Sequence, residues 1–182
     1  MKKIIVITGD LAAGKSTVAD YLSEKLHILA IEKDTVKERL CDIIGFNSRE
    51  ENRKLSLAAV SYMINTFECS TKAGTDLILE ANFRLDELNK IKDIATRNEY
   101  KMFMFNLTGD IDVLFKRFCD RIPTRHRAHM SMKLNEDKNR FAEYIQSIRD
   151  EISSFEDVVT ININNMTSEE VSNKCITVIE GE

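Results

Sequence analysis

A stretch near the start of the chain, GDLAAGKST at residues 9–17, has the residue types and spacing of a loop that binds phosphate. It matches the pattern G-x-x-x-x-G-K-[ST] in full through Gly9, Gly14, Lys15 and Ser16. Glycines let consecutive backbone N–H groups turn toward an anion, a helix N-terminus adds partial positive charge, and the lysine reaches the terminal phosphates. A simple glycine turn is disfavoured, because a β-rich run precedes the loop and a helical pattern follows it.

The loop as a whole is expected to bind a nucleoside triphosphate, with Mg²⁺ on the Ser16 hydroxyl. Its expected contacts are Gly9, Asp10, Leu11, Ala12, Ala13, Gly14, Lys15, Ser16 and Thr17. Thr17 is expected in the first helical turn rather than as a second metal ligand. The chain has no N-K-x-D motif and no D-x-x-G motif after a predicted strand, so ATP is favoured over GTP. Its small size favours a kinase over a mechanical ATPase.

Composition limits what surrounds this loop. The chain has 182 residues, 43% of them hydrophobic and 31% charged, which predicts one globular domain over residues 1–182. The formal net charge of −4 argues against a generally basic surface for nucleic acid and favours a small or transient partner. Four widely separated cysteines without a C-x-x-C pair favour a reducing cytoplasm. No stretch approaches the roughly 18 apolar residues of a membrane span.

Short apolar runs alternate with helical patterns along the chain. The runs KIIVIT, HILAIEK, TDLILEA, KMFMFNL and DVVTINI predict five strands, each followed by a helix. Strands that are apolar on both faces indicate a mostly parallel sheet covered by helices on both sides, an α/β doubly wound fold. Capping boxes are expected to start helices at Thr35 with Glu38, Ser48 with Glu51, and Thr167 with Glu170.

The most cationic short segment, RIPTRHRAHM, follows a helical pattern and contains the only proline, Pro123. Its composition predicts an exposed, mobile loop. His126, His129 and the nearby Cys119 suggest a zinc site, but their spacing fits no common one.

With these motifs in this order, the sequence resembles the small P-loop kinases with an AAA-type domain. This group includes 5'-hydroxyl polynucleotide kinases, chloramphenicol phosphotransferase and the zeta-toxin-like group. The resemblance covers the whole chain in element order and implies a single-domain P-loop fold with a short lid at about 118–132. Where those kinases have I-x-[RK]-D-D-x-[RK], this chain has IEKDTVK. The resemblance implies that Asp34 is the catalytic base and touches the magnesium shell; an ordinary helix N-cap is the alternative.

Other positions follow from the same resemblance. Lys37 stands where polynucleotide kinases have an arginine, and because lysine cannot make a bidentate fork to phosphate, a polynucleotide acceptor is less favoured. In LILEANF, Glu80 occupies the Walker B position and Asn82 is an acceptor contact; the alternative is an exposed strand end.

The lid segment implies an arginine that moves over the transferring phosphates, for which Arg121 is the best match. Arg117 and Arg125 would add nucleotide contacts and Arg127 an acceptor contact; the alternative is a solvated basic loop.

The sequence thus predicts an ATP- and magnesium-dependent transfer of phosphate to a hydroxyl of a small molecule. Lys15, Asp34 and Arg121 are the expected catalytic residues, Ser16 and Asp34 the expected metal ligands. The expected acceptor contacts are Asp34, Lys37, Glu80, Asn82 and Arg127. Two alternatives stay open: a 5'-hydroxyl polynucleotide kinase, and a regulatory protein that binds ATP without transferring phosphate.

Overall fold

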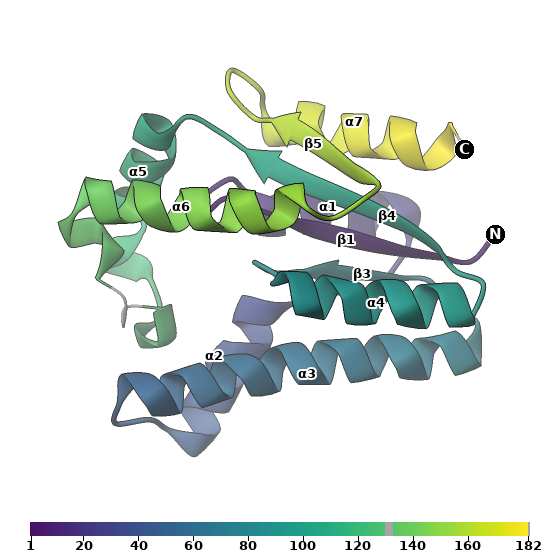
Figure 1. Cartoon of the computed structure of the whole chain (residues 1–182), viewed down its shortest axis with the longest axis horizontal. Helices are drawn as coiled ribbons and strands as arrows, with labels where there is room; N and C mark the ends of the chain where they lie inside the picture. Colours follow the sequence, from purple (N-terminus) through teal and green to yellow (C-terminus); the bar gives the residue numbers. More distant parts are fainter. Residues whose placement is uncertain (130–132, 182) are drawn as a thin grey trace.

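A five-stranded sheet forms the centre of the molecule, which we describe from a computed structural model covering residues 1–129 and 133–181 (Figure 1). The strand order is β2-β3-β1-β4-β5, and every pairing in this sheet is parallel. This confirms the expected α/β fold and makes the sheet fully, rather than mostly, parallel. The strands are β1 (Lys3–Gly9), β2 (Ala30–Glu32), β3 (Leu77–Glu80), β4 (Lys101–Thr108) and β5 (Val158–Asn162).

Seven α-helices in the described residues surround the sheet. They are α1 (Lys15–Leu26), α2 (Lys33–Ile44), α3 (Arg49–Ala73), α4 (Leu85–Arg97), α5 (Ile111–Asp120), α6 (Lys138–Ser153) and α7 (Ser168–Glu180). Three short 3-10 turns lie between α5 and α6, at Ile122–Thr124, Arg127–His129 and Leu134–Glu136. Among the described helices, none is long and apolar enough to span a membrane.

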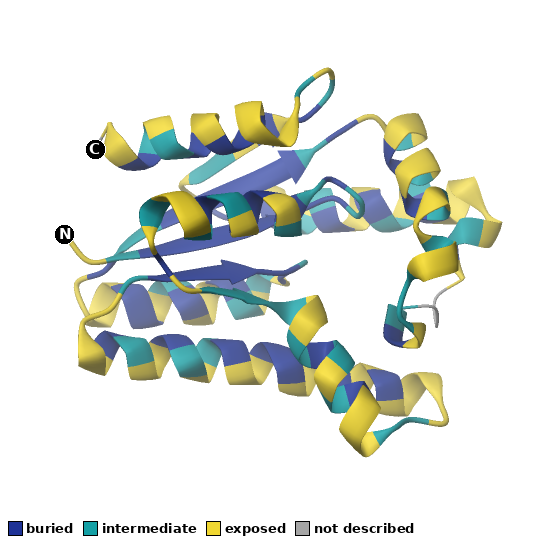
Figure 2. Ribbon diagram, turned by 180° about the vertical axis from the view of Figure 1, so that it is seen from behind, coloured by how far each residue is buried: buried dark blue, intermediate teal, exposed yellow. Residues whose placement is uncertain are grey.

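The central strand β1 is buried on both faces, as its unbroken apolar run predicts. Ile5 and Ile7 belong to a core shared with α1, α5 and α7, whereas Ile4 and Val6 belong to a second core shared with α3 and α4. Helix α6 contributes to both cores. Figure 2 shows the result, with the mostly buried strands β1, β3 and β4 between helices whose exposed residues lie on their outer sides. The two-sided covering of the sheet is therefore confirmed.

One of the three expected capping boxes is complete, and a second is half formed, because the Glu51 carboxylate accepts from the Asn47 backbone N–H and not from that of Ser48. The Ser48 side chain accepts a hydrogen bond from the Glu51 backbone N–H at 3.1 Å, and Thr167 and Glu170 cap α7 reciprocally. The box expected at Thr35 and Glu38 is wrong. Helix α2 already begins at Lys33, so the Thr35 hydroxyl donates back to the Glu32 carboxylate at 3.0 Å.

All five strands point the same way, so their carboxyl ends meet at one edge of the sheet, where ligands bind in open α/β folds. The loop of residues 9–17 follows β1, Asp34 follows β2, and Glu80 ends β3. In Figure 1, α2, α5 and the short turns after α5 gather at the same end of the molecule. The fold thus places three expected site segments next to one another.

Candidate active site

The glycines of the loop have different physical roles. Gly9 has φ of 122°, and a Cβ there would lie 2.2 Å from the Leu107 carbonyl oxygen, so only glycine fits against β4. Gly14 has φ of 85° with open space around it, and its backbone conformation alone favours glycine. Gly14 is the N-cap of α1 and no side chain caps this helix. The first-turn N–H groups of α1 are therefore available to an anion.

The Lys15 side chain is buried within this loop. Its ammonium group donates to the carbonyl oxygens of Asp10 at 2.7 Å and Gly9 at 3.3 Å. Burial lowers the pKa of Lys15, while the nearby carboxylates of Glu80 and Asp34 act in the opposite direction. The loop thus holds a cation beside the first-turn N–H groups of α1.

The Asp10 carboxylate points away from the loop and supports it from behind. It accepts hydrogen bonds from the Gly109 backbone N–H at 3.0 Å and from the Arg149 Nε at 3.1 Å, and the Asp10 side chain is fully buried. The Asp10 backbone N–H donates to the Leu107 carbonyl at 2.8 Å. Arg149 was not expected from the sequence, because it lies on α6 far along the chain. Its ion pair with Asp10 ties the loop to β4 and α6.

A small cavity of about 80 Å³ joins most of the expected site residues. It is lined by the loop residues Leu11, Ala12, Gly14, Lys15 and Ser16, by Glu32, Asp34, Glu80, Ala81 and Asn82 at the strand ends, and by Arg121 and Arg125. Hydroxyl, carboxylate, ammonium and guanidinium groups therefore face one space. This is the arrangement that stabilising a transferring phosphate requires.

Asp34 lies at the start of α2, where its side chain is about half exposed. Burial acts to raise its pKa, but the His129 ring and the charges of Lys33 and Arg125 outweigh this effect and lower the pKa. The His129 Nδ1 lies 3.7 Å from an Asp34 oxygen. The Asp34 carboxyl is thus held ionised, as an acceptor of a hydroxyl proton must be.

Glu80 is buried at the end of β3, and burial raises the pKa of its carboxyl to about 7 against the opposing effect of Lys15. The alternative that Glu80 is an exposed strand end is therefore wrong. Asn82 follows it, and the Asn82 Nδ2 is buried with no hydrogen-bond partner. Both residues line the small cavity.

The donors around this cavity fit Mg²⁺, which prefers hard oxygen ligands. Ser16, Asp34 and Glu80 present a hydroxyl and two carboxylates to the cavity. Glu32 also lines it, and the buried Glu32 Oε1 has no hydrogen-bond partner. An orphaned carboxylate oxygen beside the loop is the environment that a cation would complete.

A second cavity of about 400 Å³ lies on the other side of the loop. Thr17, Arg117 and Arg121 line it from the loop and α5. Ile163 and Met166, which precede α7, line it as well and were not expected from the sequence. Arg121 borders both this cavity and the smaller one, so it stands between them.

The described part of the expected lid segment, 118–129, contacts α2 and α3 through its last residues. The Ala128 carbonyl oxygen accepts hydrogen bonds from the Lys37 ammonium and the Asn52 amide, each at 2.8 Å. His126 contacts Asp42 at 3.0 Å, and His129 contacts Glu38 at 2.9 Å.

The expected exposed loop is therefore wrong for Ala128, which is buried, and for the His129 side chain, which is only 7% exposed. Residues 130–132 of the expected lid lie outside the described residues.

The remaining lid arginines occupy different places. Arg125 lies over the Phe118 ring at 4.9 Å and lines the small cavity, whereas Arg127 lies over the Phe46 ring at 4.9 Å. The acceptor contact expected of Arg127 thus stays a prediction. In the described part of the chain, no three histidine, cysteine or acidic side chains are placed to hold a metal ion by themselves, so Mg²⁺ in the small cavity would also need phosphate or water ligands.

Comparison with known proteins agrees with this geometry. The fold and the loop define the class of P-loop proteins, and residues 5–146 match the family model described as AAA domain. The match spans most of the chain, which therefore belongs to that family. A search of curated proteins found no match.

Solved structures resemble the whole chain in fold. A Chloroflexus aurantiacus protein assigned as a kinase is 22% identical, with a TM-score of 0.77 and 97% of each chain covered. A gluconokinase from Sinorhizobium meliloti is 12% identical, with a TM-score of 0.66, covering 98% of this chain and 92% of its own. Shikimate kinase from Aquifex aeolicus is 17% identical, with a TM-score of 0.62, covering 98% of this chain and 96% of its own. This chain therefore has the fold of small P-loop kinases.

Proposed function

We propose that this protein is an ATP- and magnesium-dependent kinase that transfers the γ-phosphate to a hydroxyl group of a small molecule. The observation that supports it most is the small cavity shared by Lys15, Asp34 and Arg121. These residues come from the loop, from α2 and from the end of α5, and only the fold joins them. The names of the structural neighbours, among them gluconokinase and shikimate kinase, are consistent with this proposal.

In the proposed reaction, the acceptor hydroxyl oxygen forms a bond to the γ-phosphorus while the bond from that phosphorus to the β,γ-bridging oxygen breaks. ADP leaves with the electron pair of the broken bond, and the hydroxyl proton moves to Asp34. The lowered pKa of Asp34 suits it to orient the hydroxyl and to accept its proton as charge develops. The first-turn N–H groups of α1 and Lys15 hold the donor phosphates.

Ser16 and Asp34 would hold Mg²⁺, with Glu80 beside them, and the ion would supply charge neutralisation at the β- and γ-phosphate oxygens. Arg121 borders both cavities, so its guanidinium is placed to stabilise charge between the donor and the acceptor. The cavity of about 400 Å³ beside Thr17 and Arg117 would take the nucleoside of ATP.

A docked lid also supports transfer over hydrolysis, because water near the γ-phosphate competes with the acceptor. Two alternatives differ in the acceptor. A 5'-hydroxyl polynucleotide kinase would phosphorylate oligonucleotides, and a regulatory protein would bind ATP without turnover.

The test is transfer from γ-labelled ATP with Mg²⁺ into two pools, cell-extract metabolites and 5'-hydroxyl oligonucleotides. We expect label in the metabolite pool with the unaltered protein and none with the Asp34→Asn variant. Label in oligonucleotides alone would favour the first alternative. ATP binding without label in either pool would favour the second.

A further inference from the structure

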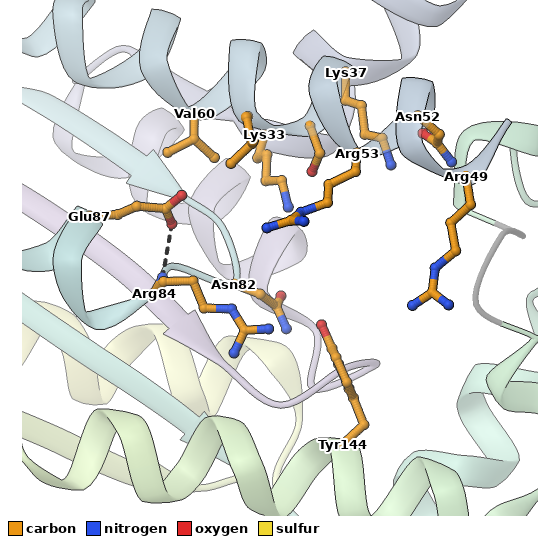
Figure 3. Close-up of a pocket in the computed structure, with 12 residues that line it drawn as sticks. Lys33, Lys37, Arg49, Asn52, Arg53, Val60, Asn82, Arg84, Glu87 and Tyr144 are labelled. Atoms are coloured by element: carbon orange, nitrogen blue, oxygen red, sulfur yellow. Dashed lines mark hydrogen bonds between the residues drawn. The ribbon is translucent and has the colours of Figure 1, made fainter. Parts of the chain in front are cut away.

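A third cavity, of about 340 Å³, lies between α3 and α6 and carries a concentration of positive charge (Figure 3). We call it the cationic pocket. Its charged lining residues are Lys33, Lys37, Arg49, Arg53 and Arg84, against a single carboxylate, that of Glu87. The whole chain has a net charge of −4, so this excess of cations is local. A pocket of this size suits a small molecule.

Two of these cations are already engaged. Arg84 forms an ion pair with Glu151 at 2.8 Å, and Lys37 donates to the Ala128 carbonyl. In contrast, Lys33, Arg49 and Arg53 have no side-chain hydrogen bond or salt bridge within the described residues. In Figure 3, Arg49 and Arg53 extend from α3 into the space above Tyr144. Three unpaired cations around one space repel one another unless an anion binds there.

Buried polar groups point to a ligand independently of this charge. Asn52 is only 2% exposed and lines the pocket, and its Oδ1 has no hydrogen-bond partner. The Asn82 Nδ2 is also buried without a partner, and Figure 3 shows this side chain between Arg84 and Tyr144. A buried polar atom without a hydrogen-bond partner is unfavourable. The two groups need opposite partners, because the Asn82 Nδ2 donates and the Asn52 Oδ1 accepts. A ligand that has both oxygen acceptors and hydroxyl donors would satisfy both.

The cationic pocket is connected to the small cavity at Asp34. A fourth cavity, of about 170 Å³, lies between them and shares Lys33, Lys37, Ser56, Asn82 and Tyr144 with the cationic pocket. It shares Asp34 with the small cavity, and Asn82 borders all three. A molecule in these cavities would therefore reach from Asp34 at one end to Arg49 and Arg53 at the other.

We propose that the acceptor is a small phosphate monoester, with its phosphate between Lys33, Arg49 and Arg53 and a separate hydroxyl at Asp34. This inference rests on the proposed function for the role of Asp34, but the anion site itself does not depend on it. Phosphate fits better than carboxylate, because three unpaired cations match a dianion and arginine forks bind phosphate oxygens in pairs.

The first experiment tests the anion site without catalysis. Inorganic phosphate is titrated by calorimetry into protein saturated with the Mg²⁺ complex of a non-hydrolysable ATP analogue, so that the loop is filled. We expect one phosphate site, weakened by about tenfold or more when both arginines are changed to glutamine. The control is Lys54→Gln, which removes an exposed charge paired with Glu50 on the same helix. Absence of binding, or equal binding by the double variant, would overturn the proposal.

The second experiment identifies the acceptor. Cell-extract metabolites are separated by anion exchange into a neutral and an anionic fraction. Part of each fraction is treated with phosphatase, which is then removed. The protein is given γ-labelled ATP with each treated and each untreated fraction. We expect label only in the anionic fraction and its loss after phosphatase. For that acceptor, Arg53→Gln should raise KM by about tenfold while kcat changes little.

The outcomes separate this inference from the proposed function. Label in the neutral fraction would confirm a kinase and overturn the phosphate-bearing acceptor. Label that survives phosphatase would overturn phosphate in favour of a carboxylate. If neither fraction were labelled, the proposed transfer would fail, and the phosphate titration would still decide whether the anion site exists.

Discussion

At the scale of single residues, the loop separates two reasons for glycine. Gly9 has no room for a side chain against Leu107, whereas Gly14 has room and needs only its positive φ. We expect Gly9→Ala to destabilise the protein by about 3 kcal/mol or more, since the backbone of β4 must move. Gly14→Ala should cost about 1–2 kcal/mol from backbone strain. Urea unfolding of both variants measures this, and equal losses would contradict the account.

Glu80 should make stability depend on pH. Its folded pKa is about 7, above the ordinary 4.5, so between these values the folded chain holds a proton that the unfolded chain has released. The free energy of unfolding should therefore fall as pH rises from about 5 to 7, by on the order of 1–3 kcal/mol. Glu80→Gln should lose this part of the slope. Urea unfolding of both proteins in EDTA at several pH values tests this prediction. The same dependence of the unfolding free energy on pH in both proteins would refute it.

At the scale of elements, docking of the lid depends on a few polar contacts to α2 and α3. Lys37→Met removes the buried ammonium group that donates a hydrogen bond to the Ala128 carbonyl oxygen. We expect hydrogen exchange of the backbone amides around Ala128 to become about tenfold faster, because a hydrogen bond from a charged group contributes about 1.5 kcal/mol or more. ATP hydrolysis without an acceptor should rise as water enters.

The control for this prediction is Arg39→Met, which removes an exposed charge from the same helix. Exchange and hydrolysis should stay at the values of the unaltered protein. If both variants behaved alike, the Lys37 contact would have no part in docking the lid.

How far the sequence predicts the molecule also differs by element. The strands and most helix starts follow from local patterns, and Lys15, Asp34 and Glu80 follow from motifs at strand ends. The Asp10 and Arg149 pair joins residues 139 positions apart, and no local pattern contains it. The cationic pocket is similar, because Lys33, Arg49 and Arg84 meet only once α2, α3 and α4 are placed. The Thr35 box failed because α2 begins earlier than its polar residues indicate.

At the scale of the whole molecule, the sheet is the rigid part that fixes the site. Ile4 and Ile5 are adjacent on β1, fully buried, and belong to different cores. Because both faces are covered, Ile4→Ala and Ile5→Ala should each cost about 2–5 kcal/mol. Thermal or urea unfolding of the two variants checks this. If one face of the sheet were solvated, the free energy of unfolding would fall strongly for one variant and only slightly for the other.

The cavities form a connected series across the whole molecule. The cavity beside Thr17 shares Arg121 with the small cavity around Lys15 and Asp34, and the small cavity shares Asn82 with the cationic pocket. Nucleotide, reacting phosphate and acceptor would occupy these cavities in that order. Asp34 stands at the junction, so it carries the central claim that this P-loop protein transfers phosphate rather than only binding ATP.

The most direct test measures ATP affinity and the rate of phosphate transfer for the unaltered protein and for Asp34→Asn. Asparagine keeps the size of the side chain but cannot accept the hydroxyl proton. We expect ATP affinity to change by less than about tenfold, or 1.4 kcal/mol, and transfer to fall by at least about 100-fold. Transfer by Asp34→Asn at the rate of the unaltered protein would contradict the account.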